Sequence, residues 1–203
     1  MKLVLIKYNA GNTQSVLYAL ERLGAEALVT ADPDEIRSAD KVIFPGVGHA
    51  KTAMESLEAN GLDAVIRELT QPVLGICVGM QLLCKHSEEE DTEALDVIPV
   101  HIKRFPSFGK DSGTGELKVP QVGWNNIYNL KSPLFEGVAE NSFIYNVHSY
   151  YAELSPFTIA TCHYGAEYAA AVQKNNFYGV QFHAEKSAEI GDKILDNFLR
   201  LGA

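Results

Sequence analysis

Short apolar runs alternate with helical spacings through the first 84 residues of the chain. Uninterrupted apolar runs, typical of strands buried on both faces, occupy positions 3–6, 27–29, 42–44 and 73–76, and Pro45 ends the third of them. Between the runs, apolar residues recur three and four positions apart over 16–23 and 53–69, which predicts helices, the first capped by Asn12 or Thr13. This alternation predicts a mostly parallel central sheet flanked by helices.

The middle of the chain has a different pattern. Residues 98–105, 119–128 and 142–152 are rich in strand-forming side chains and are separated by turns, with no strong helical pattern between them. Residues 107–117 are turn-rich, and because no GK[ST] follows their glycines we predict a loop rather than a phosphate-binding motif. A strand over 178–182 and a helix capped by Ser187 complete the chain. We therefore expect one α/β domain over residues 1–203, with an added antiparallel or mixed strand region.

Charge and cysteine content limit the kinds of partner and compartment. Acidic residues outnumber basic residues 26 to 17, so the net charge of −9 disfavours binding to nucleic acid or to an anionic membrane. Residues 86–96 hold six of those acids and no Lys or Arg, so the acidity is largely local. The apolar run near the start is too short for a membrane span. Three cysteines are too few for a disulfide scaffold and favour the reducing cytoplasm.

One cysteine has the sequence context of a nucleophile. Cys77 lies between Gly75 and Gly79, directly after a predicted strand and before an apolar segment that can form a helix. This is the thiol form of the nucleophile elbow, in which glycines permit a tight turn and the helix start favours the reactive thiolate. The backbone N–H of Val78 would then point at a developing oxyanion. The alternative is a buried structural cysteine, which is our interpretation of Cys84 and Cys162.

A second motif near the end of the chain supports the catalytic interpretation. His183 and Glu185 follow the predicted strand 178–182, and residues two apart in an extended chain share one side. The carboxylate can then orient the imidazole and stabilise its positive charge, as the base and its partner do in a catalytic triad. The other five histidines are spread singly without metal-ligand spacing, so we predict no metal site.

These motifs resemble a known family. The cysteine elbow and the His183-x-Glu185 motif resemble the class I, triad-type glutamine amidotransferases, which have a flavodoxin-like sheet. Four further strings are similar to the glutaminase subunits of imidazole glycerol phosphate synthase: Pro45-Gly-Val-Gly48, Pro120-Gln-Val-Gly-Trp-Asn125, Tyr145-Asn-Val-His-Ser-Tyr150 and Glu185-Lys-Ser187. The resemblance runs from Lys2 to Leu201. Residue 184 is alanine, where the family usually has proline.

The resemblance implies a role for each matching residue. Cys77 attacks the side-chain amide carbon of glutamine, His183 passes the thiol proton to the leaving ammonia, and Glu185 holds His183. The resulting glutamyl thioester is hydrolysed to glutamate. The implied oxyanion donors belong to Val78 and to the loop that contains Val47 and Gly48. The implied glutamine contacts are Gly46, Gly48, Gln81, Glu89, His148, Ser149 and Tyr150, whereas we expect the rest of the acidic run 88–91 to be solvated.

The resemblance also implies a partner and no cofactor. The partner is a (β/α)8-barrel cyclase subunit, which receives ammonia through an internal channel. It converts a phosphoribulosyl-formimino-AICAR ribonucleotide to imidazole glycerol phosphate and AICAR in histidine biosynthesis. The residues that match the family's partner-facing positions are Asn12, Trp124, Asn125, Tyr145 and Lys186. Two alternatives remain open: a glutaminase subunit of another class I amidotransferase, and a non-catalytic regulatory domain of the same fold.

Overall fold

Five parallel strands form the centre of the computed structural model, which describes residues 1–9, 12–106 and 117–202. The predicted parallel sheet is therefore confirmed, and its strands lie in the order β2, β1, β3, β4, β13. Their bounds are β1 Leu3–Ile6, β2 Leu28–Thr30, β3 Lys41–Gly46, β4 Val73–Cys77 and β13 Phe177–Val180.

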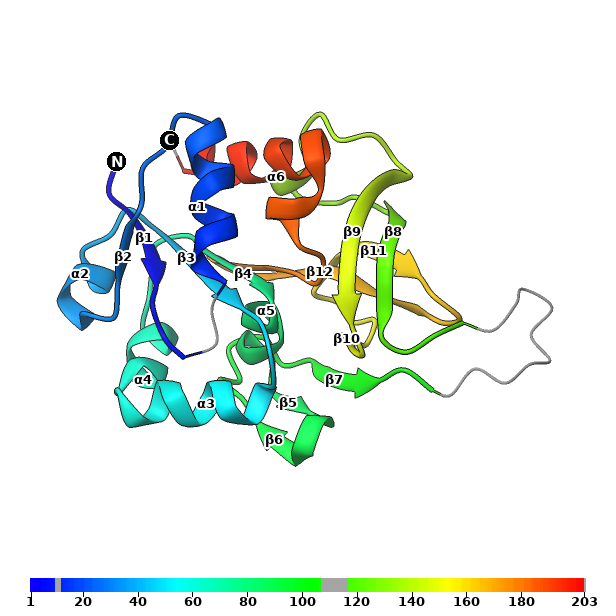
Figure 1. Ribbon diagram of the computed structural model, residues 1–203, viewed down its shortest axis with the longest axis horizontal. Helices are drawn as coiled ribbons and strands as arrows, with labels where there is room; N and C mark the ends of the chain where they lie inside the picture. Colours follow the sequence, from blue (N-terminus) through cyan, green and yellow to red (C-terminus); the bar gives the residue numbers. More distant parts are fainter. Residues whose placement is uncertain (10–11, 107–116, 203) are drawn as a thin grey trace.

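Helices cover both faces of this sheet, as predicted. Helices α1 and α6 lie on one face, and α3, α4 and α5 lie on the other (Figure 1). The side chain of Asn12 caps α1 by accepting a hydrogen bond from the N–H of Ser15. No helix in the described ranges is long and apolar enough to cross a bilayer. The bounds are α1 Thr13–Arg22, α2 Pro33–Arg37, α3 Ala50–Ala59, α4 Leu62–Arg67, α5 Val78–Leu83 and α6 Ala188–Arg200.

The mixed strand region extends the sheet beyond β13. The order continues β12, β10, β7, β5, β6, while β11 joins β12 to β8 and β8 pairs with β9. These pairings are antiparallel except that of β5 with β7. The bounds are β5 His86–Ser87, β6 Thr92–Glu93, β7 His101–Arg104, β8 Gln121–Tyr128, β9 Ser142–His148, β10 Tyr150–Ala152, β11 Thr158–His163 and β12 Glu167–Lys174; the short helices are η1 Glu89–Asp91, η2 Pro133–Phe135 and η3 Ala184–Lys186.

The structure corrects the predicted end of the third strand. Strand β3 does not stop at Pro45 but continues to Gly46, which pairs with Cys77. Strand β1 pairs with β3 only as far as Ile43, and the carbonyl of Pro45 points back toward the segment that follows β1. Because the amide nitrogen of a strand residue lies on the same edge as its carbonyl, the missing N–H of Pro45 leaves no sheet hydrogen bond unmade.

Strands β11 and β12 were not predicted. In β12, Ala169, Ala170 and Ala171 are all buried, so the polar–apolar alternation of a half-exposed strand is missing. Alanine also has a low intrinsic preference for strands. The predicted loop 107–117 falls outside the described residues except for its last position.

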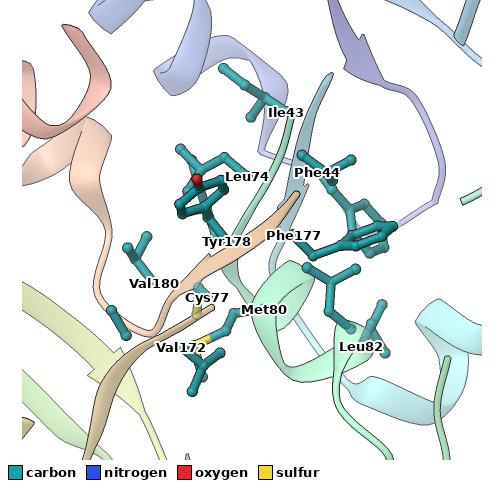
Figure 2. Packing of buried hydrophobic residues seen from close by; sticks show 14 of the residues in the cluster. Ile43, Phe44, Leu74, Cys77, Met80, Leu82, Val172, Phe177, Tyr178 and Val180 are labelled. Carbon is teal, nitrogen blue, oxygen red and sulfur yellow. The ribbon is translucent and has the colours of Figure 1, made fainter. Parts of the chain in front are cut away.

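The core positions the carboxyl end of β4 between its neighbouring strands. Figure 2 shows side chains of β3, β4 and β13 packed around this strand, with Cys77 at its end and Met80 from α5 directed toward Val172 of β12. Cys77 is buried within this cluster, with 4% of its surface exposed. The strand ends of a parallel sheet converge at one edge, which brings the elbow close to the residues that follow β13.

Candidate active site

Cys77 occupies a strained turn between β4 and α5. Its backbone adopts φ 53° and ψ −112°, a region that residues with a side chain rarely occupy. Helix α5 begins at the next residue, Val78, so the thiol lies at a helix start. Its Sγ lies 3.9 Å from both the carbonyl oxygen of Val147 and Nε2 of Gln181. The predicted elbow geometry is therefore present.

The glycines of the elbow leave no room for a side chain. A Cβ added to Gly79 would lie 1.9 Å from the carbonyl oxygen of Phe44, and one added to Gly75 would lie 2.8 Å from the backbone of Gly79. A Cβ on Gly46 would lie 2.4 Å from the nitrogen of Gly79. The elbow thus packs backbone against backbone on β3.

Substituting Gly79 with alanine is expected to lower the free energy of unfolding by about 3 kcal/mol or more, because β3 and α5 must separate to admit the methyl group. The matched control is Gly61→Ala, which has φ 65° but open space around the added carbon and should cost only about 1 to 2 kcal/mol. Denaturant unfolding of both variants measures the difference. Equal losses would mean that the close packing of the elbow contributes little to stability.

His183 and Glu185 form a buried pair beside the elbow. Nδ1 of the imidazole lies 2.7 Å from Oε1 of the carboxylate, and the two residues are 4% and 7% exposed. The predicted contact is present, but its geometry differs from the expected extended chain because Glu185 lies in the short helix η3. The tight turn brings the two side chains together, and it buries Ala184 completely.

Ser187 is the N-cap residue of α6, and its hydroxyl supports the segment that carries His183. Its hydroxyl donates to the carbonyl oxygen of His183 at 2.7 Å and accepts from the N–H of Tyr145 at 2.9 Å. Its position as the N-cap residue of α6 is confirmed, but its side chain makes no capping hydrogen bond to that helix. The N–H of His183 also donates to the carbonyl oxygen of Tyr145. These bonds join β9 to the segment that carries His183 and Glu185.

The environment favours opposite protonation states for two nearby histidines. Burial lowers the pKa of His183, but Cys77 and Glu185 outweigh this effect and raise its pKa to about 10, so the imidazole is protonated at neutral pH. Burial lowers the pKa of His148 to about 4, so this side chain is neutral. Its Nδ1 lies 2.8 Å from the carbonyl oxygen of Tyr150 and therefore carries the proton.

The other two cysteines have environments that disfavour the thiolate. Burial raises the pKa of Cys84 to about 12 and that of Cys162 to about 11. Both side chains are buried and free of disulfides. Their predicted role in packing agrees with these environments.

A cavity of about 290 Å³ opens next to Cys77 and His183. Most of the residues implied to contact glutamine line it, namely Gly48, Gln81, Glu89, His148, Ser149 and Tyr150. Val47 and Val78, the other implied oxyanion donors, line it as well. Gly46 does not, because it packs against the backbone of Val78 and Gly79. The cavity wall also includes His49, Pro120 and Val147, none of which was predicted to contact glutamine.

Glu89 differs from the rest of its acidic run. It is 8% exposed, whereas Glu88, Glu90 and Asp91 are exposed, as expected for a solvated charge run. Its Oε2 accepts the N–H of Ala50 at 2.7 Å, and its Oε1 lies 3.3 Å from Nδ1 of His49. Among the described residues that line the cavity, Glu89 is the single carboxylate. It is therefore suited to bind a substrate ammonium group.

The predicted partner-facing residues are only partly brought together. Trp124 is 54% exposed, and its ring lies 5.7 Å from that of Tyr145, its cross-strand partner. Asn125 is adjacent to Trp124 in β8 and so points to the opposite face, where it donates to the carbonyl oxygen of His163. Lys186 lies in η3, which contacts both β9 and the helix that Asn12 caps.

A strained cysteine elbow and a histidine–glutamate pair that follow two neighbouring strands, at one edge of a mostly parallel sheet, form the arrangement implied by the amidotransferase resemblance. Residues 4–201 match the family model described as glutamine amidotransferase class-I, and the chain therefore belongs to that family. Within it, the chain is 52% identical to the imidazole glycerol phosphate synthase subunit HisH of Bacteroides thetaiotaomicron, over 99% of this chain and 100% of the relative. It is 45% identical to the protein of the same name from Shewanella loihica, over 98% and 91% of the two chains.

Solved structures agree on the fold. A crystal structure of a glutamine amidotransferase matches 98% of this chain and 97% of its own, with a TM-score of 0.73 and 17% identity. The PurLQS structure from Thermotoga maritima matches 98% and 97% of the two chains, with a TM-score of 0.70 and 17% identity. At such identities the likeness concerns the fold alone.

Proposed function

We propose that this chain hydrolyses glutamine and delivers the ammonia to a cyclase subunit that forms imidazole glycerol phosphate and AICAR in histidine biosynthesis. The observation that carries the proposal is Cys77, held in a strained elbow at a cavity that is also lined by His183, the partner of the buried Glu185. The relatives at 52% and 45% identity are named as subunits of imidazole glycerol phosphate synthase. We propose a single domain over residues 1–203 and a cytoplasmic location, which the free cysteines favour.

The proposed reaction begins with the Cys77 thiolate and the His183 imidazolium. The thiolate attacks the side-chain amide carbon of glutamine and forms a tetrahedral oxyanion, which the N–H of Val78 and one N–H from the Val47–Gly48 loop stabilise. His183 donates its proton to the nitrogen as ammonia leaves, and a glutamyl thioester remains. Water then attacks the thioester, with His183 acting as base, and releases glutamate and the free thiol.

The polar groups of the cavity account for substrate orientation. Glu89, with its buried negative charge, binds the α-ammonium group of glutamine in this proposal. Gln81 is held by hydrogen bonds from its Nε2 to Oε1 of Gln181 and to the carbonyl of Tyr150. Ser149 and Tyr150 line the same wall as His148 and face the α-carboxylate end in this proposal, whereas the Nδ1 proton of His148 is already donated to the carbonyl oxygen of Tyr150. A substrate fixed at this end places its amide carbon against the elbow.

An exposed apolar surface on β8 and β9 supports the proposal that this chain binds a protein partner. Its members Val122, Trp124, Phe143 and Val147 are each between 37% and 60% exposed. The register pairs Val122 with Val147 and Trp124 with Tyr145, so these side chains form one continuous stripe on the outer face. We propose that the barrel subunit covers this stripe and receives ammonia there, because large exposed apolar areas mark interfaces.

Replacing Trp124 with alanine is expected to weaken binding of the cyclase subunit by about 30-fold, since a central tryptophan commonly contributes about 2 kcal/mol or more. The matched control is Leu28→Ala, on the edge strand β2 and 45% exposed, which should leave affinity unchanged. Titration calorimetry with the purified barrel subunit measures both. Unchanged affinity of the tryptophan variant would place the interface elsewhere.

The proposed function is tested by mixing the chain with the barrel subunit. Glutamate release should be slow for the chain alone and should rise when the barrel and its ribonucleotide are present. Activation by a different synthase instead would favour another class I amidotransferase. Failure of a glutamine-derived alkylating agent to label Cys77, even with the barrel present, would favour a non-catalytic regulatory domain.

A further inference from the structure

The Val47–Gly48 loop, which carries one of the two proposed oxyanion donors, lies in a segment held at both ends by side chains from distant parts of the chain. The pairing of β3 with β1 ends at Ile43. Two residues further along β3, the carbonyl oxygen of Pro45 accepts a hydrogen bond from the hydroxyl of Tyr8 at 2.7 Å. At the far end, Glu89 accepts the N–H of Ala50 at 2.7 Å. Residues 46–49 lie between the hydrogen bonds at Pro45 and Ala50, and they include the Val47–Gly48 loop.

We propose that Tyr8 is a positioning residue for the transition state: its hydroxyl fixes the strand end from which the Val47–Gly48 loop projects over Cys77. This inference rests on the proposed glutaminase function and deepens it. Tyr8 does not line the cavity, so it acts through the loop rather than on glutamine.

Sheet register explains why Pro45 is an effective point of attachment. Pro45 pairs with Ile76, and Gly46 pairs with Cys77, so the strand end and the nucleophile lie side by side. A shift of the Pro45 carbonyl therefore moves the amides of Val47 and Gly48 relative to Sγ. Gly48 has φ 95° and open space around its α-carbon, so local packing at that residue offers little resistance to such a shift. The hydroxyl of Tyr8 gives the Pro45 carbonyl the hydrogen bond that a backbone N–H of a longer β1 would otherwise donate.

Tyr8 is suited to act as a permanent donor. Burial, together with the negative charge of the Cys77 thiolate, raises the pKa of its hydroxyl well above the usual value. The group therefore remains protonated at neutral pH. Its ring packs against Phe44 with a centroid distance of 5.3 Å, so a phenylalanine would keep the packing and remove only the hydroxyl.

The decisive variant is Tyr8→Phe, assayed in the complex with the barrel subunit in the presence of its ribonucleotide. Because oxyanion stabilisation acts in the transition state, kcat for glutamine hydrolysis should fall about tenfold while KM changes less than about twofold. Ammonia-dependent synthesis should be unchanged. The matched control is Tyr18→Phe on α1, where the tyrosine is 57% exposed and the same atom is removed without effect.

A purely structural role for the hydroxyl predicts a different result. It would lower the melting temperature and the amount of active enzyme but leave kcat per active site, counted by labelling of Cys77, unchanged. That result, or a rise in KM at constant kcat, would overturn the proposal.

A second measurement separates this proposal from the glutaminase assignment. The γ-aldehyde of glutamate adds to a cysteine thiol, forming a C–S bond and a hemithioacetal whose oxygen occupies the oxyanion hole. The aldehyde should bind Tyr8→Phe about tenfold more weakly than the wild type, whereas glutamate should bind both equally. Equal aldehyde binding would overturn the role of Tyr8. A wild-type complex that fails to hydrolyse glutamine would instead overturn the proposed function.

Discussion

Replacing Cys77 with alanine is expected to reduce glutamine-dependent synthesis by more than about 10⁴-fold, because without the sulfur no thioester forms. Ammonia-dependent synthesis by the complex should stay within about twofold of the wild type, since the cyclase reaction needs ammonia and not the thiol. The alanine methyl group occupies less volume than the thiol, so the elbow and the partner interface should be retained. Coupled assays with glutamine and with ammonium salts measure the two activities side by side.

Cys84→Ala is the matched control for this prediction. Cys84 is fully buried at the end of α5, and its substitution should cost about 1 kcal/mol of stability while leaving glutamine hydrolysis intact. If Cys77→Ala still released glutamate from glutamine, Cys77 would not be the nucleophile. If both activities fell together, the variant would have disturbed the complex.

Substituting Glu185 with glutamine is expected to lower kcat for glutamine hydrolysis by about 10³- to 10⁴-fold, with KM changing less than about threefold. Glutamine has the same shape but no charge, so it cannot stabilise the imidazolium of His183, which lies 2.7 Å away. The amide can also present an N–H to Nδ1 and favour the wrong tautomer. The residual reaction would then depend on the oxyanion donors alone.

The same substitution should also change the pH profile. Glu185 is one of the groups that raise the pKa of His183 to about 10, so its neutralisation lowers that pKa. The imidazolium that protonates the leaving ammonia is then lost at lower pH, and the basic limb of kcat/KM should move to lower pH. The control is Glu189→Gln, an exposed residue in the first turn of α6, for which neither kcat nor the profile should change. An unshifted basic limb for Glu185→Gln would contradict the assigned pairing.

Much of the fold was predictable because it follows from local patterns. Apolar runs and helical spacings located the parallel strands and their helices, and glycines on both sides of Cys77 indicated the elbow. Neighbouring residues determine these features, since strand and helix periodicities repeat over a few positions. Patterns of this kind fail where a buried strand is built from alanines, as in β12, or where a proline lies beyond the last residue that pairs with one neighbouring strand, as Pro45 does in β3.

The site depended more strongly on contacts between distant residues. Cys77 and His183 are 106 positions apart, and their proximity comes from the parallel pairing of β4 with β13. Glu89 could be singled out only by resemblance, because four consecutive acids have the same composition and only the fold buries one of them. Ser187 satisfied the sequence rule for a helix cap, yet the approach of β9 directs its hydroxyl to Tyr145 and His183 instead.

The sequence by itself determined the class of fold, the cysteine elbow and the histidine–glutamate motif, since each is encoded within a few neighbouring residues. Only the tertiary structure decided that Glu89 lines the cavity, that Gly46 packs against the backbone of the elbow instead, and that Tyr8 reaches the carbonyl of Pro45. The reason is physical: a hydrogen bond or a burial energy between residues far apart in the chain exists only after the sheet has set their positions, and no local periodicity encodes it.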